Sequence, residues 1–225
     1  MITFLHWFQA NFIHLDQSLA HIVALYGTWV YAILFMIIFC ETGLVITPFL
    51  PGDALLFAIG AFAAAKPEGG IRYAYALGLL TLAAIIGNMV NFMFGRTIGG
   101  HIFKENALIL KKAYLNRAHL FFEKHGAKAL ILARFLPIFR TLVPFVAGIA
   151  GMNFRKFSFY STMGSVLWVV SMMTAGLLFG RIDWVQHHFE SVVIGIILVS
   201  MLPLVYEALA HWAALRREKK EGKKL

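Results

Sequence analysis

Residues 41–53 have the sequence ETGLVITPFLPGD, and this stretch decides the fold. It interrupts an apolar region with two charges and two helix-breaking residues: Glu41, Asp53, Pro48 and Pro51. Proline removes a backbone donor and breaks a helix, and a charge in hydrocarbon costs about 2.5–3.5 kcal/mol. The twelve apolar residues that follow, 54–65, are too few to cross a bilayer, because a helix rises about 1.5 Å per residue and hydrocarbon is about 30 Å thick. Segment 41–65 is therefore predicted to turn back instead of spanning the membrane.

A second apolar segment, 129–151, is interrupted in a similar way. Its central part, 133–148, has the sequence ARFLPIFRTLVPFVAG and contains Arg134 and Arg140. The residues predicted to shape the two turning segments are prolines and glycines: Pro48, Pro51, Gly52, Pro137, Pro144 and Gly148. The first segment carries only negative side chains and the second only positive ones. Opposite charges at membrane depth favour a meeting of the two segments.

The composition of the chain predicts an integral membrane protein and argues against a soluble enzyme. Of the 225 residues, 60% are hydrophobic and 14% are charged, and the mean hydropathy is +0.75. Soluble domains have about 45–50% apolar and about 25% charged residues. One cysteine, Cys40, excludes an internal disulfide. The net charge of +9 comes largely from 96–128 and the tail 216–224, a distribution typical of cytoplasmic loops, so nucleic acid is not expected as a partner.

The predicted organisation is a single membrane domain over 1–225, all-α, with about four transmembrane helices and two re-entrant hairpins. The expected segments are an interfacial amphipathic helix 1–21, spans 22–40, 73–94, 157–180 and 191–212, hairpins 41–65 and 129–151, a basic cytoplasmic segment 96–128 and a basic tail 213–225. We expect the tail to lie on anionic lipid head groups.

The sidedness of the charges predicts that the two hairpins enter from opposite faces. If the basic segment 96–128 and the tail are both cytoplasmic, loop 181–190 is external and 129–151 must return to the side from which it enters. Counting the membrane crossings in the same way makes 41–65 return to the external side. Non-helical backbone at membrane depth is tolerated only inside protein or beside a water-filled cavity. The hairpins should therefore meet near the midplane, as interrupted helices do in transporters built from inverted repeats.

Glu41, Asp53, Arg134 and Arg140 are the candidate substrate-binding and proton-binding residues. Four unpaired charges in hydrocarbon would cost roughly 10–14 kcal/mol, so they must be paired, hydrated or shallow. The alternative is that each side chain reaches the nearest head-group layer separately. Arginine suits a phosphate group because its planar fork donates two parallel hydrogen bonds.

Other polar residues give weaker indications. Asn88 and Asn91 either line a cavity or hydrogen-bond to a neighbouring helix. His187 and His188 lie beside Glu190 without a third ligand at metal spacing, so no metal or other cofactor is predicted. Gly95 and Gly99 have a spacing compatible with a homo-oligomer.

The two interrupted segments resemble the signatures of the DedA family of bacterial inner-membrane proteins. The first match is Glu41-Thr42-Gly43 with Thr47-Pro48-Phe49-Leu50-Pro51-Gly52-Asp53. The second is Arg134-Phe135-Leu136-Pro137 with Arg140-Thr141, Pro144 and Ala147-Gly148, and further matches are Gly126 and Trp168. The resemblance implies two facing re-entrant hairpins, a location in the bacterial inner membrane, and transport or scrambling of lipids such as undecaprenyl phosphate, with proton coupling. It also implies a functional role for the four charged residues. The chain departs from the family pattern at Asn88, where an acidic residue is common, and at Ala54, where serine is common.

Three functions are compatible with these observations. The leading hypothesis is a transporter that moves a phosphate-bearing lipid between leaflets, with the arginines on the phosphate and the carboxylates gating it or carrying protons. The second is a scaffold for membrane assembly or envelope homeostasis, in which the charges lock the hairpins together. A membrane-embedded enzyme is the least supported, because no nucleophile–base pair or metal spacing occurs at the broken segments.

Overall fold

The protein is all-helical in the part of the chain that the structure describes. A computed structural model describes residues 26–44, 52–65, 71–102, 126–136, 139–188, 191–192 and 194–196. Its elements are α3 (Trp29–Gly43), α4 (Gly52–Ala65), α5 (Tyr73–Ile102), η1 (Gly126–Lys128), α7 (Ala129–Leu132), η2 (Ala133–Phe135), α8 (Phe139–Ile149), α9 (Phe154–Phe179) and α10 (Asp183–His187). No strand occurs within these ranges.

Two long apolar helices, α5 and α9, form the frame of the molecule. The stretches Tyr73–Thr97 and Phe154–Phe179, with 25 and 26 residues, are long and apolar enough to cross a membrane. The helices run antiparallel, since Tyr73 at the start of α5 contacts Thr174 near the end of α9. Asn153 is the N-cap of α9: its side chain accepts hydrogen bonds from the backbone N–H groups of Arg155 and Lys156. The spans predicted over 73–94 and 157–180 thus correspond to helices, although α5 continues to Ile102.

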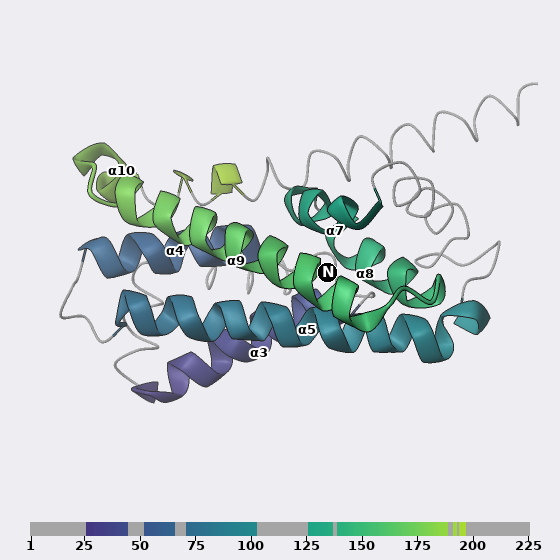
Figure 1. Cartoon of the computed structure of the whole chain (residues 1–225). Coiled ribbons are helices and arrows are strands. Elements are labelled where there is room, and N and C mark those ends of the chain that lie inside the picture. Colours follow the sequence, from purple (N-terminus) through teal and green to yellow (C-terminus); the bar gives the residue numbers. More distant parts are fainter. Residues whose placement is uncertain are drawn as a thin grey trace, which may run out of the picture.

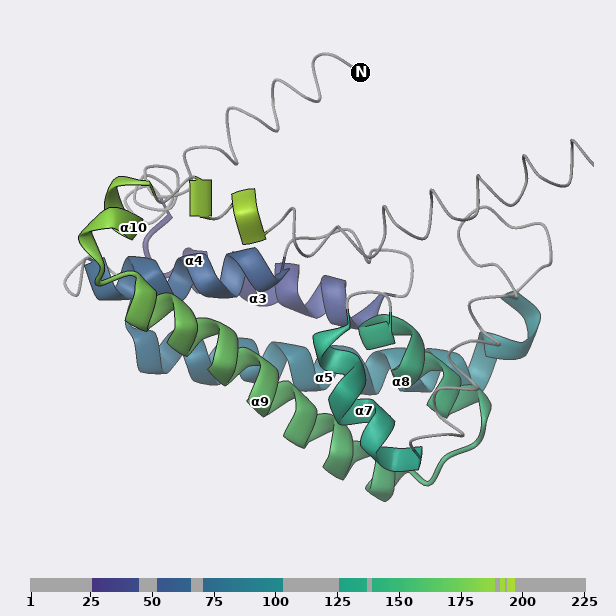
Figure 2. The same cartoon turned by 90° about the horizontal axis from the view of Figure 1, so that it is seen from above.

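The shorter helices divide between the two ends of this frame. In Figures 1 and 2, α3 and α4 lie along one half of α5 and α9, and α7 and α8 lie along the other half. On one side α3 packs on α5 and α4 on α9, whereas on the other α7 packs on α9 and α8 on α5. With 15, 14 and 11 residues, α3, α4 and α8 are all shorter than the roughly 20 residues that a spanning helix needs.

Four glycines hold α4 and α8 against the long helices in equivalent ways. A Cβ at Gly60 of α4 or at Gly176 of α9 would overlap a backbone carbonyl oxygen of the other helix. Gly95 of α5 and Gly148 of α8 have the same reciprocal relation. In each helix, the carbonyl oxygen that approaches the facing glycine belongs to the residue three positions before that helix's own glycine: Phe57, Met173, Phe92 and Phe145. The contact between α4 and α9 therefore repeats as the contact between α8 and α5.

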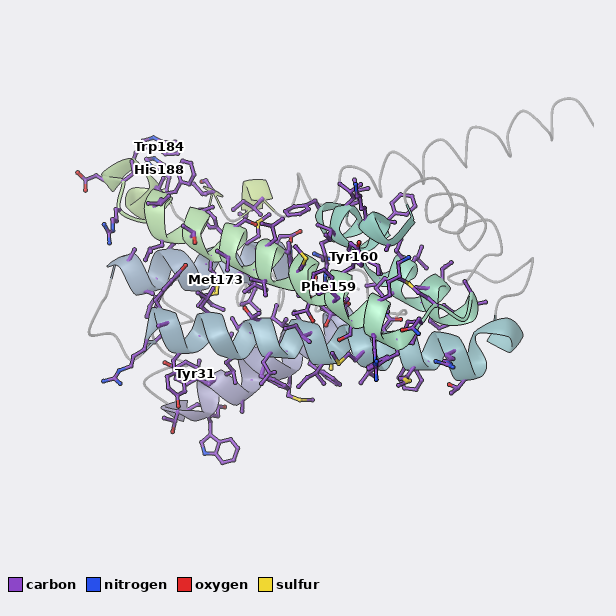
Figure 3. All side chains as sticks on the ribbon, viewed as in Figure 1. Tyr31, Phe159, Tyr160, Met173, Trp184 and His188 are labelled. Atoms are coloured by element: carbon purple, nitrogen blue, oxygen red, sulfur yellow. The ribbon has the colours of Figure 1, made fainter. Side chains whose placement is uncertain are left out.

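Each end of the frame has its own hydrophobic core. Ile38, Leu56 and Trp168 belong to the core around α3 and α4, and Phe92 and Phe157 to the core around α7 and α8. The rings of Phe92 and Phe157 are stacked with their centroids 4.1 Å apart. Large apolar side chains also point outward, among them Phe159 on α9 and Trp184 on α10 (Figure 3). Outward apolar faces on helices with buried charged residues agree with a membrane protein.

Within the described residues, the helix that corresponds to the first predicted span, 22–40, ends three residues later, at Gly43. A turn at Gly27, whose φ is +51°, precedes α3, and the helix continues past residue 40 to Gly43. The helix continues because Thr42 is satisfied inside it: its hydroxyl donates to the carbonyl oxygen of Ile38 at 2.9 Å. Fifteen residues give a length of about 22 Å. Glu41 therefore lies on the last turn of α3, not in a loop after a complete span.

The start of α3 lies beside the start of α5. The backbone N–H of Arg72 donates to the Tyr31 hydroxyl at 2.8 Å, and the rings of Tyr31 and Tyr75 are 6.1 Å apart. The helices predicted over 1–21 and most of 191–212, the middle of the basic segment 96–128 and the tail 213–225 lie outside the described residues.

Candidate functional site

Arg140 brings three short helices together. It is the second residue of α8, and its guanidinium forms ion pairs with Glu41 at the end of α3 and with Asp53 at the start of α4. The Arg140 Nη1 to Asp53 Oδ1 distance is 3.1 Å, and Nη2 donates to Glu41 Oε1. Glu41 is fully buried and Arg140 is 4% exposed. One arginine of the second interrupted segment thus neutralises both carboxylates of the first.

Gly52 makes room for the Glu41 carboxylate. Its backbone N–H donates to Glu41 Oε1 at 3.2 Å, and a Cβ at this position would overlap the carboxylate. Any residue larger than glycine would have to displace Glu41 from Arg140. The role predicted for Gly52 was to shape the turn, and the structure adds this contact with the charged site.

Trp168 of α9 lies against both arginines and one carboxylate. Its indole Nε1 donates to Asp53 Oδ1 at 2.7 Å. Its ring centroid is 5.3 Å from Arg134 Cζ and 5.4 Å from Arg140 Cζ, within the range of cation–π attraction. Sequence reasoning used Trp168 only as part of the family resemblance. A tryptophan at the middle of an apolar span was the available signal, because a buried indole N–H needs an acceptor.

Arg134 is buried, and its direct hydrogen-bond partners are uncharged. It lies in η2 and is 2% exposed. Its Nη2 donates to Ser165 Oγ at 2.7 Å and to the carbonyl oxygen of Ala84 at 3.3 Å. Its Nη1 has no hydrogen-bond partner, and neither carboxylate of the site forms an ion pair with it among the described residues. The two arginines therefore have different environments although both are buried next to Trp168.

Asn88 and Asn91 hydrogen-bond to neighbouring elements, which is the second of the two alternatives for these residues. Asn91 Nδ2 donates to the carbonyl oxygens of Thr42 at 3.1 Å and Thr141 at 2.9 Å. These carbonyls belong to the residues directly after Glu41 and Arg140, so Asn91 ties α3 and α8 to α5.

Asn88 makes the corresponding link between α5 and α9. Its Nδ2 donates to Ser161 Oγ at 2.8 Å and to Ser165 Oγ at 3.3 Å. Ser165 thus accepts from both Asn88 and Arg134. Neither serine was singled out from the sequence, because serine in an apolar helix more often bonds to its own backbone.

The structure describes only some of the residues that were predicted to shape the hairpins. Pro48, Pro51 and Pro137 lie outside the described residues. Pro144 is inside α8, and Gly148 lies near the end of that helix. Gly148 does not form a turn there; its missing side chain admits the backbone of α5. The structure adds a packing role to the predicted hairpin-shaping one, because close helix packing and turning select the same residue type.

The site retains unused hydrogen-bonding capacity. Five buried polar atoms have no partner in the part of the chain that the structure describes: Glu41 Oε2, Asn88 Oδ1, Asn91 Oδ1, Arg134 Nη1 and Arg140 Nε. Buried polar atoms are rarely unpaired in native proteins. All five come from the charged site or from the two asparagines, so this is where the protein can bind a polar ligand.

The four charged side chains lie together in one buried site instead of extending separately to different head-group layers. Glu41, Asp53 and Arg140 are in direct contact, and Arg134 shares the Trp168 ring with Arg140. Within the described residues, no group of three or more His, Cys, Asp or Glu side chains is placed to hold a metal ion. The arrangement can bind an anion, exchange ion-pair partners or accept a proton on a carboxylate.

Comparisons with known proteins identify relatives over nearly the whole chain. The family model of the VTT domain matches residues 50–178, which include Asp53, both arginines and Trp168. Protein DedA of Escherichia coli K12 is 48% identical over 216 residues, covering 95% of this chain and 98% of the relative.

More distant relatives cover a similar range. The inner membrane protein YqjA of Escherichia coli K12 is 35% identical over 190 residues, covering 84% of this chain and 85% of its own length. An uncharacterized membrane protein of Mycobacterium leprae is 36% identical over 189 residues, covering 84% and 82%. No solved structure matches. A family model that matches more than half of the chain and a relative that is nearly half identical over its full length lead to one conclusion: the chain belongs to the DedA family of membrane proteins, which carry the VTT domain.

Proposed function

We propose that this protein is a lipid transporter that moves a phosphate-bearing lipid, undecaprenyl phosphate or a phospholipid, between the two leaflets of the bacterial inner membrane. The observation that carries the proposal is the buried site in which Arg140 holds Glu41 and Asp53 while Arg134 keeps an unpartnered Nη1. A phosphate at membrane depth needs donors that replace its hydration, and guanidinium groups supply them. A site between two interrupted segments also agrees with the usual place of transporter sites.

The charge balance of the site supports coupling to protons. Two carboxylates and two arginines give a net charge of zero when all four are ionised. An entering phosphate adds negative charge to a buried region where an uncompensated charge is costly. Protonation of Glu41 or Asp53 would offset that charge. We therefore propose that the lipid anion and a proton occupy the site together.

The membrane placement belongs to the same proposal. In it α5 and α9 span the membrane, and two hairpins enter from opposite faces and meet at the charged site. The bounds of the helices suggest one change to the sequence-based scheme: α3 and α4 together form the first hairpin, because α3 is short and begins beside Arg72 at the start of α5. The second hairpin consists of η1, α7, η2 and α8. The tail remains cytoplasmic.

Cysteine labelling tests this placement. In a Cys40→Ala background, single cysteines at Leu110 and Lys220 should react only from the cytoplasm, and one at Gln186 only from outside. A cysteine at Ala24 should also react from outside if α3 is an arm of the first hairpin, and from the cytoplasm if 22–40 spans. Labels at 110 and 220 on opposite sides would overturn the re-entrant placement of 129–151.

Leaflet exchange in reconstituted liposomes tests the function. The purified full chain should accelerate exchange of a fluorescent phosphate-bearing lipid, and a proton gradient should change the rate. Glu41→Gln should still bind the lipid, whereas the effect of the gradient should weaken because a titrating group is lost. Gln186→Ala, in α10 beyond the end of α9, serves as a control.

A scaffold is the second candidate, and the two ion pairs of Arg140 favour it because they join the two interrupted segments. A scaffold would not accelerate exchange of any lipid in the liposome assay. Equal rates with the parent protein and with empty liposomes would therefore replace the transporter proposal by the scaffold.

A further inference from the structure

We infer that the two arginines have different tasks: Arg134 binds the phosphate, and Arg140 is a positioning residue that holds the two carboxylates and the two interrupted segments together. This assignment rests on the proposed function, because the anion is taken to be the phosphate of the transported lipid. It replaces the symmetrical expectation that both arginines bind the anion.

Arg140 is already engaged by two negative charges. Nη1 and Nη2 donate to Asp53 and Glu41, and both carboxylates belong to the other interrupted segment. An anion that bound to Arg140 would first have to displace one of these carboxylates, or be placed beside both of them. Like charges in contact at a buried site are unfavourable. As long as both carboxylates are ionised, Arg140 with its two partners carries a net negative charge, which repels a phosphate.

Arg134, in contrast, has no negatively charged group among its direct contacts in the described part of the chain. Its direct contacts among the described residues are a serine hydroxyl, a backbone carbonyl and the Trp168 ring, none of which carries a full charge. Its side chain is 98% buried, since only 2% of its surface is exposed, and Nη1 has no partner among the described residues. A buried cation with a free donor attracts an anion, and a phosphate oxygen is an acceptor of the right charge and geometry.

Trp168 keeps the two environments apart. Its Nε1–H holds Asp53 Oδ1, the same oxygen that accepts from Arg140, while its ring lies against both guanidinium groups. Asp53 is thereby fixed on the Arg140 side and does not pair with Arg134. Trp168 is thus a second positioning residue, because it preserves a cation that is available to a ligand.

Ser165 fixes the orientation of Arg134. It contacts Nη2 at 2.7 Å, which leaves Nη1 as the donor for the ligand. Ser161 lies one turn earlier on α9, is also buried and also accepts from Asn88, yet it forms no hydrogen bond with Arg134. The two serines therefore form a matched pair in which only one supports the phosphate-binding arginine.

The ligand chemistry that fits is a phosphate group, and it can come from a lipid head group or from free phosphate. The probe for the first source is a fluorescent short-chain phosphatidic acid, titrated against the purified full chain in detergent micelles. Inorganic phosphate is added as a competitor to test the second source. Displacement only above millimolar phosphate assigns the site to the lipid, and displacement at micromolar phosphate would overturn that assignment.

Paired variants separate the tasks of the two arginines through two readouts, affinity for the probe and thermal stability. Arg134→Gln should weaken binding about tenfold or more, since a hydrogen bond between charged groups is lost, while thermal stability stays at or above that of the parent. Arg140→Gln should mainly lower thermal stability, and Glu41→Gln added to it should restore part of the loss. If Arg134→Gln binds like the parent, or if Arg140→Gln lowers affinity without lowering stability, the assignment is overturned.

The serine pair provides a test that does not remove a charge. Ser165→Ala should weaken probe binding about three- to tenfold, in line with one lost hydrogen bond, and Ser161→Ala should leave it unchanged. Equal losses from both serines would mean that Ser165 acts only through helix packing and would overturn its role. Absence of probe binding by the parent protein would overturn the proposed function as well. Binding by the parent with the wrong pattern among the variants would overturn only the division between the arginines.

Discussion

The half formed by α3, α4 and α5 and the half formed by α7, α8 and α9 share a packing scheme but carry opposite charges. In both, the second short helix packs on the long helix of the other half through a reciprocal pair of glycines. The first half contributes Glu41 and Asp53, and the second contributes Arg134 and Arg140. The shared contacts involve backbone atoms, whereas the differences lie in side chains. The scaffold can thus repeat while the site it builds is asymmetric.

The first arms of the two halves also differ in structure. The helix α3 is continuous over 15 residues, whereas the corresponding arm of the second half consists of η1, α7 and η2. It ends at Leu136, which is extended with φ −114° and ψ 110°. A residue before proline avoids the helical region, and Pro137 follows. The short, irregular arm places Arg134 in contact with α9 and α5, whereas the ion pairs to the carboxylates are made by Arg140.

The largest expected effect comes from removing the charge that joins the halves. Arg140→Ala strands both buried carboxylates and should lower the free energy of unfolding by about 3–5 kcal/mol and abolish transport. Glu41→Ala leaves Arg140 paired with Asp53, so its cost should be smaller. Chemical unfolding in mixed micelles measures both. A larger loss for Glu41→Ala would contradict the central place of Arg140.

The glycine contacts test whether the halves are equivalent in packing. Gly60→Ala and Gly148→Ala should each destabilise by about 1–3 kcal/mol, because both force a methyl group into a facing backbone carbonyl. Gly78→Ala is the control: a Cβ there meets nothing within 4 Å, so it should be neutral or stabilise by roughly 0.5–1 kcal/mol. Unequal losses at the two glycines, measured by thermal unfolding, would break the equivalence.

Asn91 hydrogen-bonds to both α3 and α8 and so links the two halves, and its loss should have an intermediate effect. Asn91→Ala removes the donor from two buried carbonyl oxygens, Thr42 and Thr141, and should cost about 1–2 kcal/mol. Asn88→Ala should cost less, because one of its two partners, the Ser165 hydroxyl, also accepts from Arg134 and donates to the Ser161 carbonyl oxygen. Hydrogen exchange should increase at the end of α3 and in α8 for the Asn91 variant alone. Increased exchange in both variants would contradict this link.

The smallest effect is expected at the end of the frame, away from the site. Tyr73→Phe removes the hydrogen bond to Thr174 between α5 and α9 and should cost about 0.6 kcal/mol, the average for such bonds in membranes. Tyr75 lies on the same helix, is 69% exposed and contacts the Tyr31 ring without a hydrogen bond among the described residues. Tyr75→Phe should therefore leave the free energy of unfolding unchanged. A cost at Tyr73 as large as that at Asn91 would show that the frame, and not the site, holds the halves together.

Local features made part of the molecule predictable. Charges and prolines inside apolar stretches predicted both interruptions and the four charged site residues, because the cost of a charge or a missing backbone donor depends little on distant residues. The hydropathy of 73–94 and 157–180 predicted the two long helices for the same reason. The helix α3 continues to Gly43, beyond the predicted span 22–40, because Thr42 satisfies its hydroxyl within the helix and Glu41 is balanced by a residue 99 positions away.

The sequence by itself determined that this is a membrane protein with two interrupted segments of opposite charge, since composition and helix breaking act over a few residues. Only the tertiary structure decided that Arg140 takes both carboxylates and that Arg134 takes none. The partners of these side chains lie 87, 99 and 31 positions away, and Trp168 reaches Asp53 across 115 positions. Such pairs form only when helices pack at a particular depth and rotation. That packing is set by close backbone contacts at Gly60, Gly95, Gly148 and Gly176, where the sequence shows only a small residue.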